Sequence, residues 1–189
     1  GSLTVSAGGD GLKSSEDNDE AKGFVALGDA TVNVTSGDDG VSATTDVTVD
    51  GTTLSIAAGG GQANATVSEE QGPGQGAPDQ GAPGQDQGAG GQADESQSQS
   101  ESSTASPKGI NAGVTYAQDT GSVTIDAADE GLQAAFVNVN GGSLDIASGD
   151  DGINASNGDY TIEGYENADS ESDDGSVLTI SGGQVQIDY

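Results

Sequence analysis

The sequence predicts an all-β protein, and specifically a parallel β-helix with about 22 residues in each coil. Two observations lead to this fold class. Short pairs of aliphatic residues alternate with polar ones and return at a nearly constant distance, as from Val25 to Val47, which are 22 residues apart. A turn phrase of acid, glycine and aliphatic residue also recurs, in the segments 5–14, 34–43, 125–134 and 146–155, and its tail returns at 109–112.

The alternating pairs define the expected strands in chain order. Alternation with a period of two is typical of short strands with one buried face. The second strand of a coil begins seven residues after the first, as from Val25 to Val32, and the turn phrase begins a third strand, so each coil has three sides. A flat sandwich is the alternative, but it does not require a repeat of 22 residues. The pairs lie at 25–27, 32–34, 47–49, 54–56, 114–116, 123–125, 137–139, 144–146, 160–162, 178–180 and 185–187.

The composition favours a narrow core within one domain. The 189 residues are 31% hydrophobic and 3% aromatic, with no Trp, so they cannot fill a wide globular interior. A repeat architecture needs only one thin layer of Val, Ile and Leu in each coil. The 33 glycines fit the many turns that such an architecture contains.

Two insertions interrupt the repeat. We expect coils over residues 1–61, a disordered insertion rich in Gly, Gln, Ser, Pro and acid over 62–106, and further coils over 107–189. The insertion has too little apolar content to offset the entropy of ordering. The shorter acidic stretch 164–176 is interpreted as a solvated loop. Because the chain starts and stops within its pattern, we also expect a fragment truncated at both ends.

The charge balance limits the partners. Against 32 acidic residues stand 3 basic ones, for a formal net charge of −29. Such a chain is poorly suited to nucleic acid or to anionic membrane surfaces. No segment is typical of membrane insertion, and we expect a monomer. The absence of Cys and His disfavours zinc and copper and leaves an oxygen-seeking ion such as calcium.

The carboxylates of the turn phrases are the candidate calcium ligands. Stacked coils would place neighbouring carboxylates at strand spacing, where they repel one another unless a divalent ion lies between them. The alternative is that Asp-Gly turns simply face water. The candidate ligands are Asp10, Asp38, Asp39, Asp129, Glu130, Asp150 and Asp151.

Lys108 stands where the other turn phrases carry an acid. It could act as a cation between Asp39 and Glu130. It could also be the Brønsted base of a polysaccharide lyase that uses calcium. Flanking carboxylates favour the charged lysine, and the chain has no Arg to hold a substrate carboxylate, so both observations disfavour the lyase.

Aromatic residues that could stack on sugars are scarce. Phe24 and Phe136 share the register just before an inward Val and are expected at outward or corner positions. Tyr165 lies in the acidic stretch, where it could be exposed. Tyr116 and Tyr160 occupy inward registers and are assigned to the core.

These turn phrases resemble a known family. The segments 36–43, 107–110, 129–132 and 150–155, with Gly-Gly turns between them, look like the bacterial secreted carbohydrate-binding β-helix proteins related to family 9 polysaccharide lyases. The resemblance covers nearly everything except 62–106. It implies a right-handed parallel β-helix, bound calcium, and affinity for cellulose or acidic plant-wall sugars without established lyase activity. The long insertion departs from the family pattern, and one coil of fuller members is missing.

The expected function is therefore calcium-dependent binding of a cell-wall polysaccharide, such as cellulose or polygalacturonate, at the bacterial surface. A lyase that uses Lys108 and a purely structural stalk or adhesin are the alternatives. A signal or lipoprotein anchor is expected upstream of this stretch.

Overall fold

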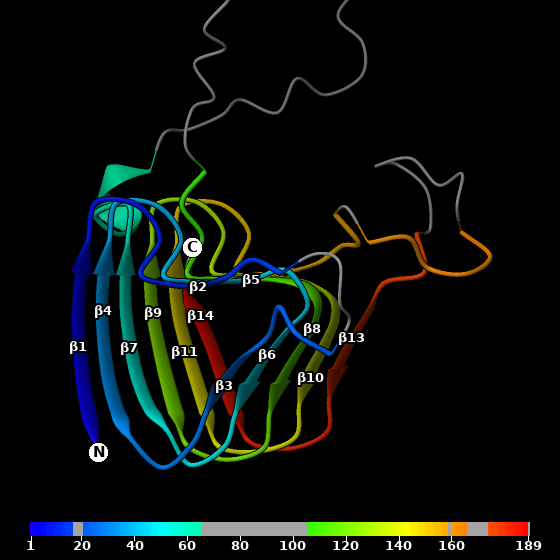
Figure 1. Cartoon of the computed structure of the whole chain (residues 1–189), viewed down its shortest axis with the longest axis horizontal. Helices are drawn as coiled ribbons and strands as arrows, with labels where there is room; N and C mark the ends of the chain where they lie inside the picture. Colours follow the sequence, from blue (N-terminus) through cyan, green and yellow to red (C-terminus); the bar gives the residue numbers. More distant parts are fainter. Residues whose placement is uncertain (17–20, 66–105, 159, 166–173, 189) are drawn as a thin grey trace, which may run out of the picture. The chain divides into compact units, whose positions relative to one another are not determined.

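The described part of the protein is all-β, as the sequence predicts. The computed structural model describes residues 1–16, 21–65, 106–158, 160–165 and 174–188, all of which belong to one compact unit. Fourteen strands and a single short 3-10 helix, η1 (Gln62–Asn64), form this part of the chain (Figure 1).

The strands form two sheets in which every pairing is parallel. The six-stranded sheet has the order β1 (Ser2–Ala7), β4 (Thr31–Ser36), β7 (Thr53–Ala58), β9 (Ser122–Ala127), β11 (Ser143–Ser148) and β14 (Gln184–Asp188). The eight-stranded sheet contains β2 (Leu12–Ser14), β3 (Val25–Leu27), β5 (Val41–Ala43), β6 (Asp46–Val49), β8 (Ile110–Gln118), β10 (Leu132–Val139), β12 (Ile153–Ala155) and β13 (Val177–Ile180).

The prediction of a three-sided parallel β-helix is wrong. The strands form two sheets of six and eight strands in place of a single solenoid. The reason lies in β8 and β10, each of which runs through both the strand expected after the turn phrase and the strand expected next. Two of the three expected sides are therefore halves of one sheet. At the expected corner β5 and β6 are separate strands, whereas β8 and β10 run through it with a register shift between Ala134 and Phe136.

The parallel register itself follows the sequence period. Val34 pairs with Ile56, Ile56 with Ile125, and Ile125 with Ile146 across the six-stranded sheet. All four are buried, as predicted for an inward row. They join inward residues of the eight-stranded sheet, such as Leu132, in one hydrophobic cluster. Both sheets therefore share a core of Val, Ile, Leu and Ala. Along each strand, these inward residues alternate with residues whose side chains point outward.

The predicted insertion lies mostly outside the described residues, which leave out 66–105. Its first residues form η1, where the Gln62 backbone N–H donates to Asp126 at 2.7 Å and the Gln62 side chain donates to the Ser148 carbonyl at 2.9 Å. The acidic stretch 164–176 is described only at 164–165 and 174–176. Within the described ranges, the chain contains no helix with the length and apolar character needed to cross a membrane.

Candidate functional site

The turns that lead from the six-stranded sheet into the eight-stranded sheet are stacked. Each turn glycine donates its N–H to the carbonyl of the residue before the next glycine, for example Gly11 to Asp39 at 2.8 Å and Gly131 to Asp151 at 2.8 Å. This places five predicted positions in one line, as the sequence period requires. We call them the turn row: Asp10, Asp39, Lys108, Glu130 and Asp151.

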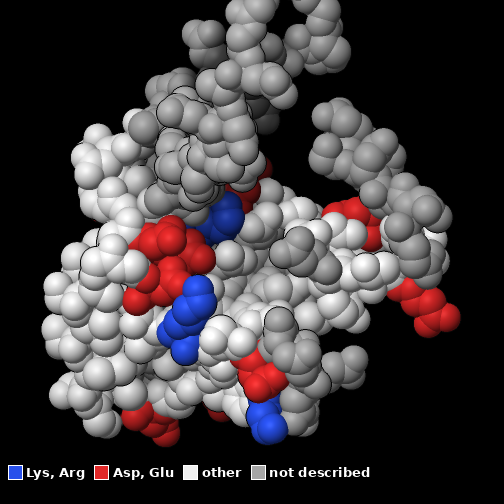
Figure 2. All heavy atoms as spheres, turned by 45° about the horizontal axis from the view of Figure 1, so that its top comes forward, with Lys and Arg blue, Asp and Glu red and all other residues white. Residues whose placement is uncertain are grey.

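At one end of the turn row, Asp10, Asp38 and Asp39 converge. One carboxylate oxygen from each lies within 4.8 Å of the other two. Oxygens around one calcium ion at 2.3–2.6 Å are separated by up to about 5 Å, so this spacing suits that ion. Lys13 borders the cluster, with Nζ 2.5 Å from Oδ2 of Asp10. Figure 2 shows acidic side chains gathered in a patch, with basic side chains against it.

Asp39 is the buried member of this cluster. Burial raises the pKa of its carboxyl group, although the Lys108 backbone N–H and the Asn111 amide both donate to it and act in the opposite direction. The charges of Asp38 and Asp10 add to the rise. A divalent cation between the three carboxylates would remove this repulsion and favour the ionised form.

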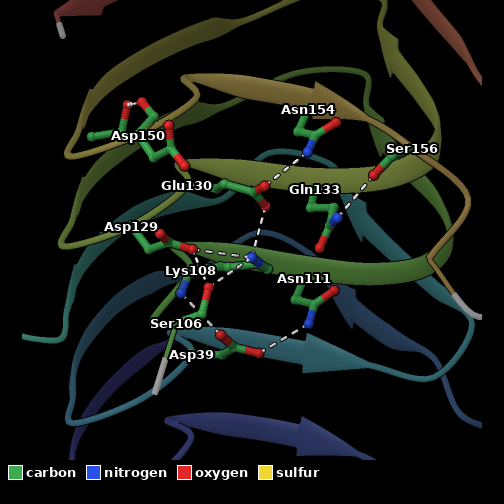
Figure 3. A network of polar contacts seen from close by, with 11 residues as sticks. Asp39, Ser106, Lys108, Asn111, Asp129, Glu130, Gln133, Asp150, Asn154 and Ser156 are labelled. Atoms are coloured by element: carbon green, nitrogen blue, oxygen red, sulfur yellow. Dashed lines mark hydrogen bonds and ion pairs between the residues drawn. The ribbon is translucent and has the colours of Figure 1, made fainter. Parts of the chain in front are cut away.

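Lys108 takes the role of a cation further along the turn row (Figure 3). Its Nζ lies 2.8 Å from Oε2 of Glu130 and 3.2 Å from Oδ2 of Asp129. Ser106 donates to the same Asp129 oxygen. Oε2 of Glu130 is buried and has no other partner among the described residues, so the ammonium group alone compensates it. Lys108 does not bridge Asp39 and Glu130, because only its backbone N–H reaches Asp39, at 2.9 Å.

The pKa of Lys108 bears on the lyase alternative. Burial disfavours the charged ammonium group, but the hydrogen bonds and charges of Glu130 and Asp129 outweigh burial and raise the pKa above its ordinary value of 10.5. The pKa of Asp129 is lowered, because the hydrogen bond from Ser106 and the charge of Lys108 outweigh its partial burial. A lysine that stays protonated at neutral pH has no free electron pair with which to accept a proton.

The remaining predicted ligands are arranged differently. Asp129 and Glu130 both pair with Lys108, whose single positive charge offsets one of their two negative charges. Asp150 and Asp151 are exposed at the following turn. The structure therefore brings Asp10, Asp38 and Asp39 together as a candidate metal site and separates them from the rest.

A second line of polar side chains runs beside the turn row and was missed by the sequence analysis. Asn111 donates to Oδ2 of Asp39 at 3.1 Å, and Asn154 donates to Oε1 of Glu130 at 2.7 Å. We call the line the amide row: Ser42, Asn111, Gln133 and Asn154, which pair in register on β5, β8, β10 and β12. The sequence contains a pattern that could have predicted this row, because each of its residues follows a turn glycine by two positions.

The aromatic side chains lie mostly on the outer face. Phe24 is 51% exposed and Tyr165 is 39% exposed, while Phe136 is half-buried and points outward between buried neighbours. Tyr116 is fully buried, as predicted. The assignment of Tyr160 to the core is wrong, because it is 40% exposed and its ring meets that of Phe136 edge-on, with centroids 6.4 Å apart.

These features define a class of protein: an acidic all-β scaffold with stacked rows of carboxylate, amide and hydroxyl groups. Residues 1–152 match the family model described as "Carbohydrate-binding domain-containing protein", and the chain belongs to this family. The carbohydrate-binding part of the sequence-based resemblance is thereby confirmed. Neither a curated protein nor a solved structure matches the chain.

Proposed function

We propose that this protein is a calcium-dependent carbohydrate-binding module that binds cell-wall polysaccharide, such as cellulose or acidic sugars, outside the cell. Membership of the carbohydrate-binding family supports the ligand class. The observation that carries the calcium dependence is the convergence of the Asp10, Asp38 and Asp39 carboxylates within 4.8 Å.

Calcium would act here on the sheet as well as on its own ligands. Oδ2 of Asp39 orients the Asn111 amide, and the Asp39 oxygens also anchor the Lys108 backbone. An ion that binds the folded cluster and not the unfolded chain stabilises the fold, by about 2.7 kcal/mol at a hundredfold excess over its dissociation constant. Magnesium should stabilise less, because it demands strict octahedral geometry.

The first experiment measures thermal melting in chelator, in calcium and in sodium chloride of matched ionic strength. We expect calcium to raise the midpoint beyond matched salt in the native chain. Asp10→Asn with Asp38→Asn should abolish that increment. The matched control is Asp145→Asn with Asp50→Asn, which removes the same charge from carboxylates outside the cluster. Equal calcium responses in both double variants would refute the site.

A variant of Lys13 provides a second test of the calcium site. Its ammonium group competes with a metal ion for Oδ2 of Asp10, from which it lies 2.5 Å. Lys13→Met should therefore raise calcium affinity, measured by isothermal titration calorimetry. Pull-down on cellulose and on polygalacturonate, with and without calcium, then tests the carbohydrate itself. A chain that melts normally but binds no polysaccharide would favour the structural stalk.

A further inference from the structure

A groove of about 920 Å³ crosses the outer face of the eight-stranded sheet. On one side of the groove lie β2, β5 and the first halves of β8 and β10. On the other side lie β3, β6 and the second halves of β8 and β10, and the register shift between Ala134 and Phe136 is close by. Lys13 lies at the β2 end of this line, Thr44 and Asn111 line its middle, and Gln133 and Tyr160 lie towards its β12 end. Because strands are about 4.8 Å apart, the path from β2 across β5 and β8 to β10 and β12 is roughly 19 Å long.

The polar groups in the groove are oriented in advance. The amide of Asn111 must turn its NH₂ group towards Asp39, because a carboxylate only accepts hydrogen bonds. The amide of Gln133 donates in the same way to Oγ of Ser156, at 2.8 Å. No partner for either amide carbonyl oxygen lies among the described residues. The carboxylate partner fixes the Asn111 oxygen as an acceptor for hydroxyl groups, and the Ser156 hydroxyl group holds the Gln133 amide in place. Groups held in advance lose little entropy on binding.

Tyr160 supplies an apolar surface at one end of the groove. Its ring lies at 73° to the ring of Phe136, which supports it from one side and leaves it 40% exposed. A supported aromatic ring buries a large apolar area when a flat, partly apolar molecule covers it. The C–H face of a pyranose ring has this character.

The charges in the groove decide between neutral and acidic sugars. Among the described residues that line it, Lys13 is the single cation and Asp46 the single acid. Lys13 is already paired with Asp10, and the chain carries a formal net charge of −29. A polyuronate would bring further negative charge to a surface with no unpaired cation along this path, which costs electrostatic free energy.

From these observations, we infer that the groove is the glycan-binding site and that its ligand is a neutral oligosaccharide segment lying across the strands, with one sugar ring on Tyr160 and hydroxyl groups on Asn111 and Gln133. This inference rests on the proposed carbohydrate-binding function and narrows its substrate class. The inference about the groove does not require the calcium site to be correct.

The test titrates the full chain with neutral hexasaccharides (cellohexaose, xylohexaose, mannohexaose) and with hexagalacturonate, in calcium and in chelator. We expect at least one neutral hexasaccharide to bind about tenfold more tightly than hexagalacturonate. Tyr160→Ala and Gln133→Ala should each weaken that binding about tenfold, as expected for the loss of one ring contact or hydrogen bond. Asn33→Ala, which changes an exposed residue outside the groove, should leave it unchanged.

The outcomes separate this inference from the proposed function. Glycan binding that resists Tyr160→Ala and Gln133→Ala, or that prefers hexagalacturonate, overturns the groove assignment and leaves carbohydrate binding in place. Neutral binding that is equal in chelator and calcium supports the groove and refutes calcium dependence. If no glycan binds to the correctly folded chain, both fail. Circular dichroism of each variant confirms folding.

Discussion

Lys108 occupies the position at which neighbouring turn phrases carry a carboxylate, and its partners explain why a cation stands there. Glu130, beside it, is 8% exposed, and the ammonium group of Lys108 is the group that compensates the buried Oε2 atom. A buried carboxylate that loses its partner keeps its desolvation cost and loses the compensating attraction. At this position the chain therefore carries its own cation.

The first prediction at this scale concerns Lys108→Met. The variant should lower the free energy of unfolding by about 3 kcal/mol at pH 7, because it leaves Glu130 buried and unpaired. Lys13→Met is the matched control: the Lys13 side chain is 56% exposed, and removing its ion pair with Asp10 should cost about 0.5 kcal/mol. Urea denaturation at constant ionic strength measures both. Equal losses in the two variants would contradict the buried role of Lys108.

The pH dependence of this cost provides an independent check. Because the folded protein raises the pKa of Lys108 above 10.5, its stabilising contribution is complete below that pH and is lost as pH rises through the folded value. The difference in stability between the native chain and Lys108→Met should therefore shrink at strongly alkaline pH. Tyr116 has its pKa raised by burial in both proteins, so its effect cancels in the difference.

At the scale of the elements, the turn glycines are required by close packing. A Cβ atom on Gly131 would lie 2.4 Å from Cγ2 of Ile146 and 2.5 Å from the Gly152 carbonyl oxygen. Gly131 does not have a positive φ, so conformational freedom is not the reason for glycine here. The acid-glycine-aliphatic phrase thus combines a carboxylate of the turn row with a glycine whose backbone lies against an inward side chain of the six-stranded sheet.

The second prediction follows from this contact. Gly131→Ala should lower the free energy of unfolding by about 1–3 kcal/mol, because the added methyl group overpacks a position enclosed by Ile146 and backbone. Gly28→Ala is the control, since a Cβ atom there meets nothing within 4 Å. The melting midpoints of both variants, measured in the same buffer, provide the comparison. A Gly131→Ala protein as stable as Gly28→Ala would show that the turn can move aside.

At the scale of the whole molecule, the long interruption between η1 and β8 separates two stretches that pair directly. Val41 on β5 pairs with Ile110 on β8, so the parallel register continues across the interruption. Residues at both borders are nevertheless fixed to the sheets. Gln62 donates to Asp126 and Ser148, and Ser106 contacts Asp129 and Lys108.

The third prediction concerns this interruption. Replacing 66–105 with a flexible Gly-Ser linker should change the melting midpoint by only a few degrees, because closure entropy varies slowly with loop length. Replacing 62–106 with a linker of the same type should destabilise more, since it also removes the hydrogen bonds of Gln62 and Ser106. The two replacements are compared by differential scanning calorimetry. A large loss in the first protein would show that 66–105 packs on the sheets.

The sequence by itself determined most of the strands, their parallel register and the residues that share a row. The described residues 160–162 do not form the strand expected there, and Leu178 of β13 pairs with Val137 instead. The properties that the sequence determined follow from the repeat period and from the alternation of apolar and polar residues, and both can be identified in the linear sequence without knowledge of tertiary contacts. The row of Val34, Ile56, Ile125 and Ile146 and the alignment of Asp10, Asp39, Lys108 and Glu130 follow from that period once the insertion 62–106 is set aside.

The tertiary structure alone decided how many sheets the strands form and which side chains meet. β8 and β10 continue through the expected corner and pair with each other on both sides of it, whereas β5 and β6 are separate strands, and the repeat period does not distinguish these cases. The choice of Glu130 and Asp129 as partners of Lys108, and the exposure of Tyr160 beside Phe136, depend on side-chain directions that a linear period does not specify. The groove follows from the same directions, because it lies between residues that only the folded sheet brings together.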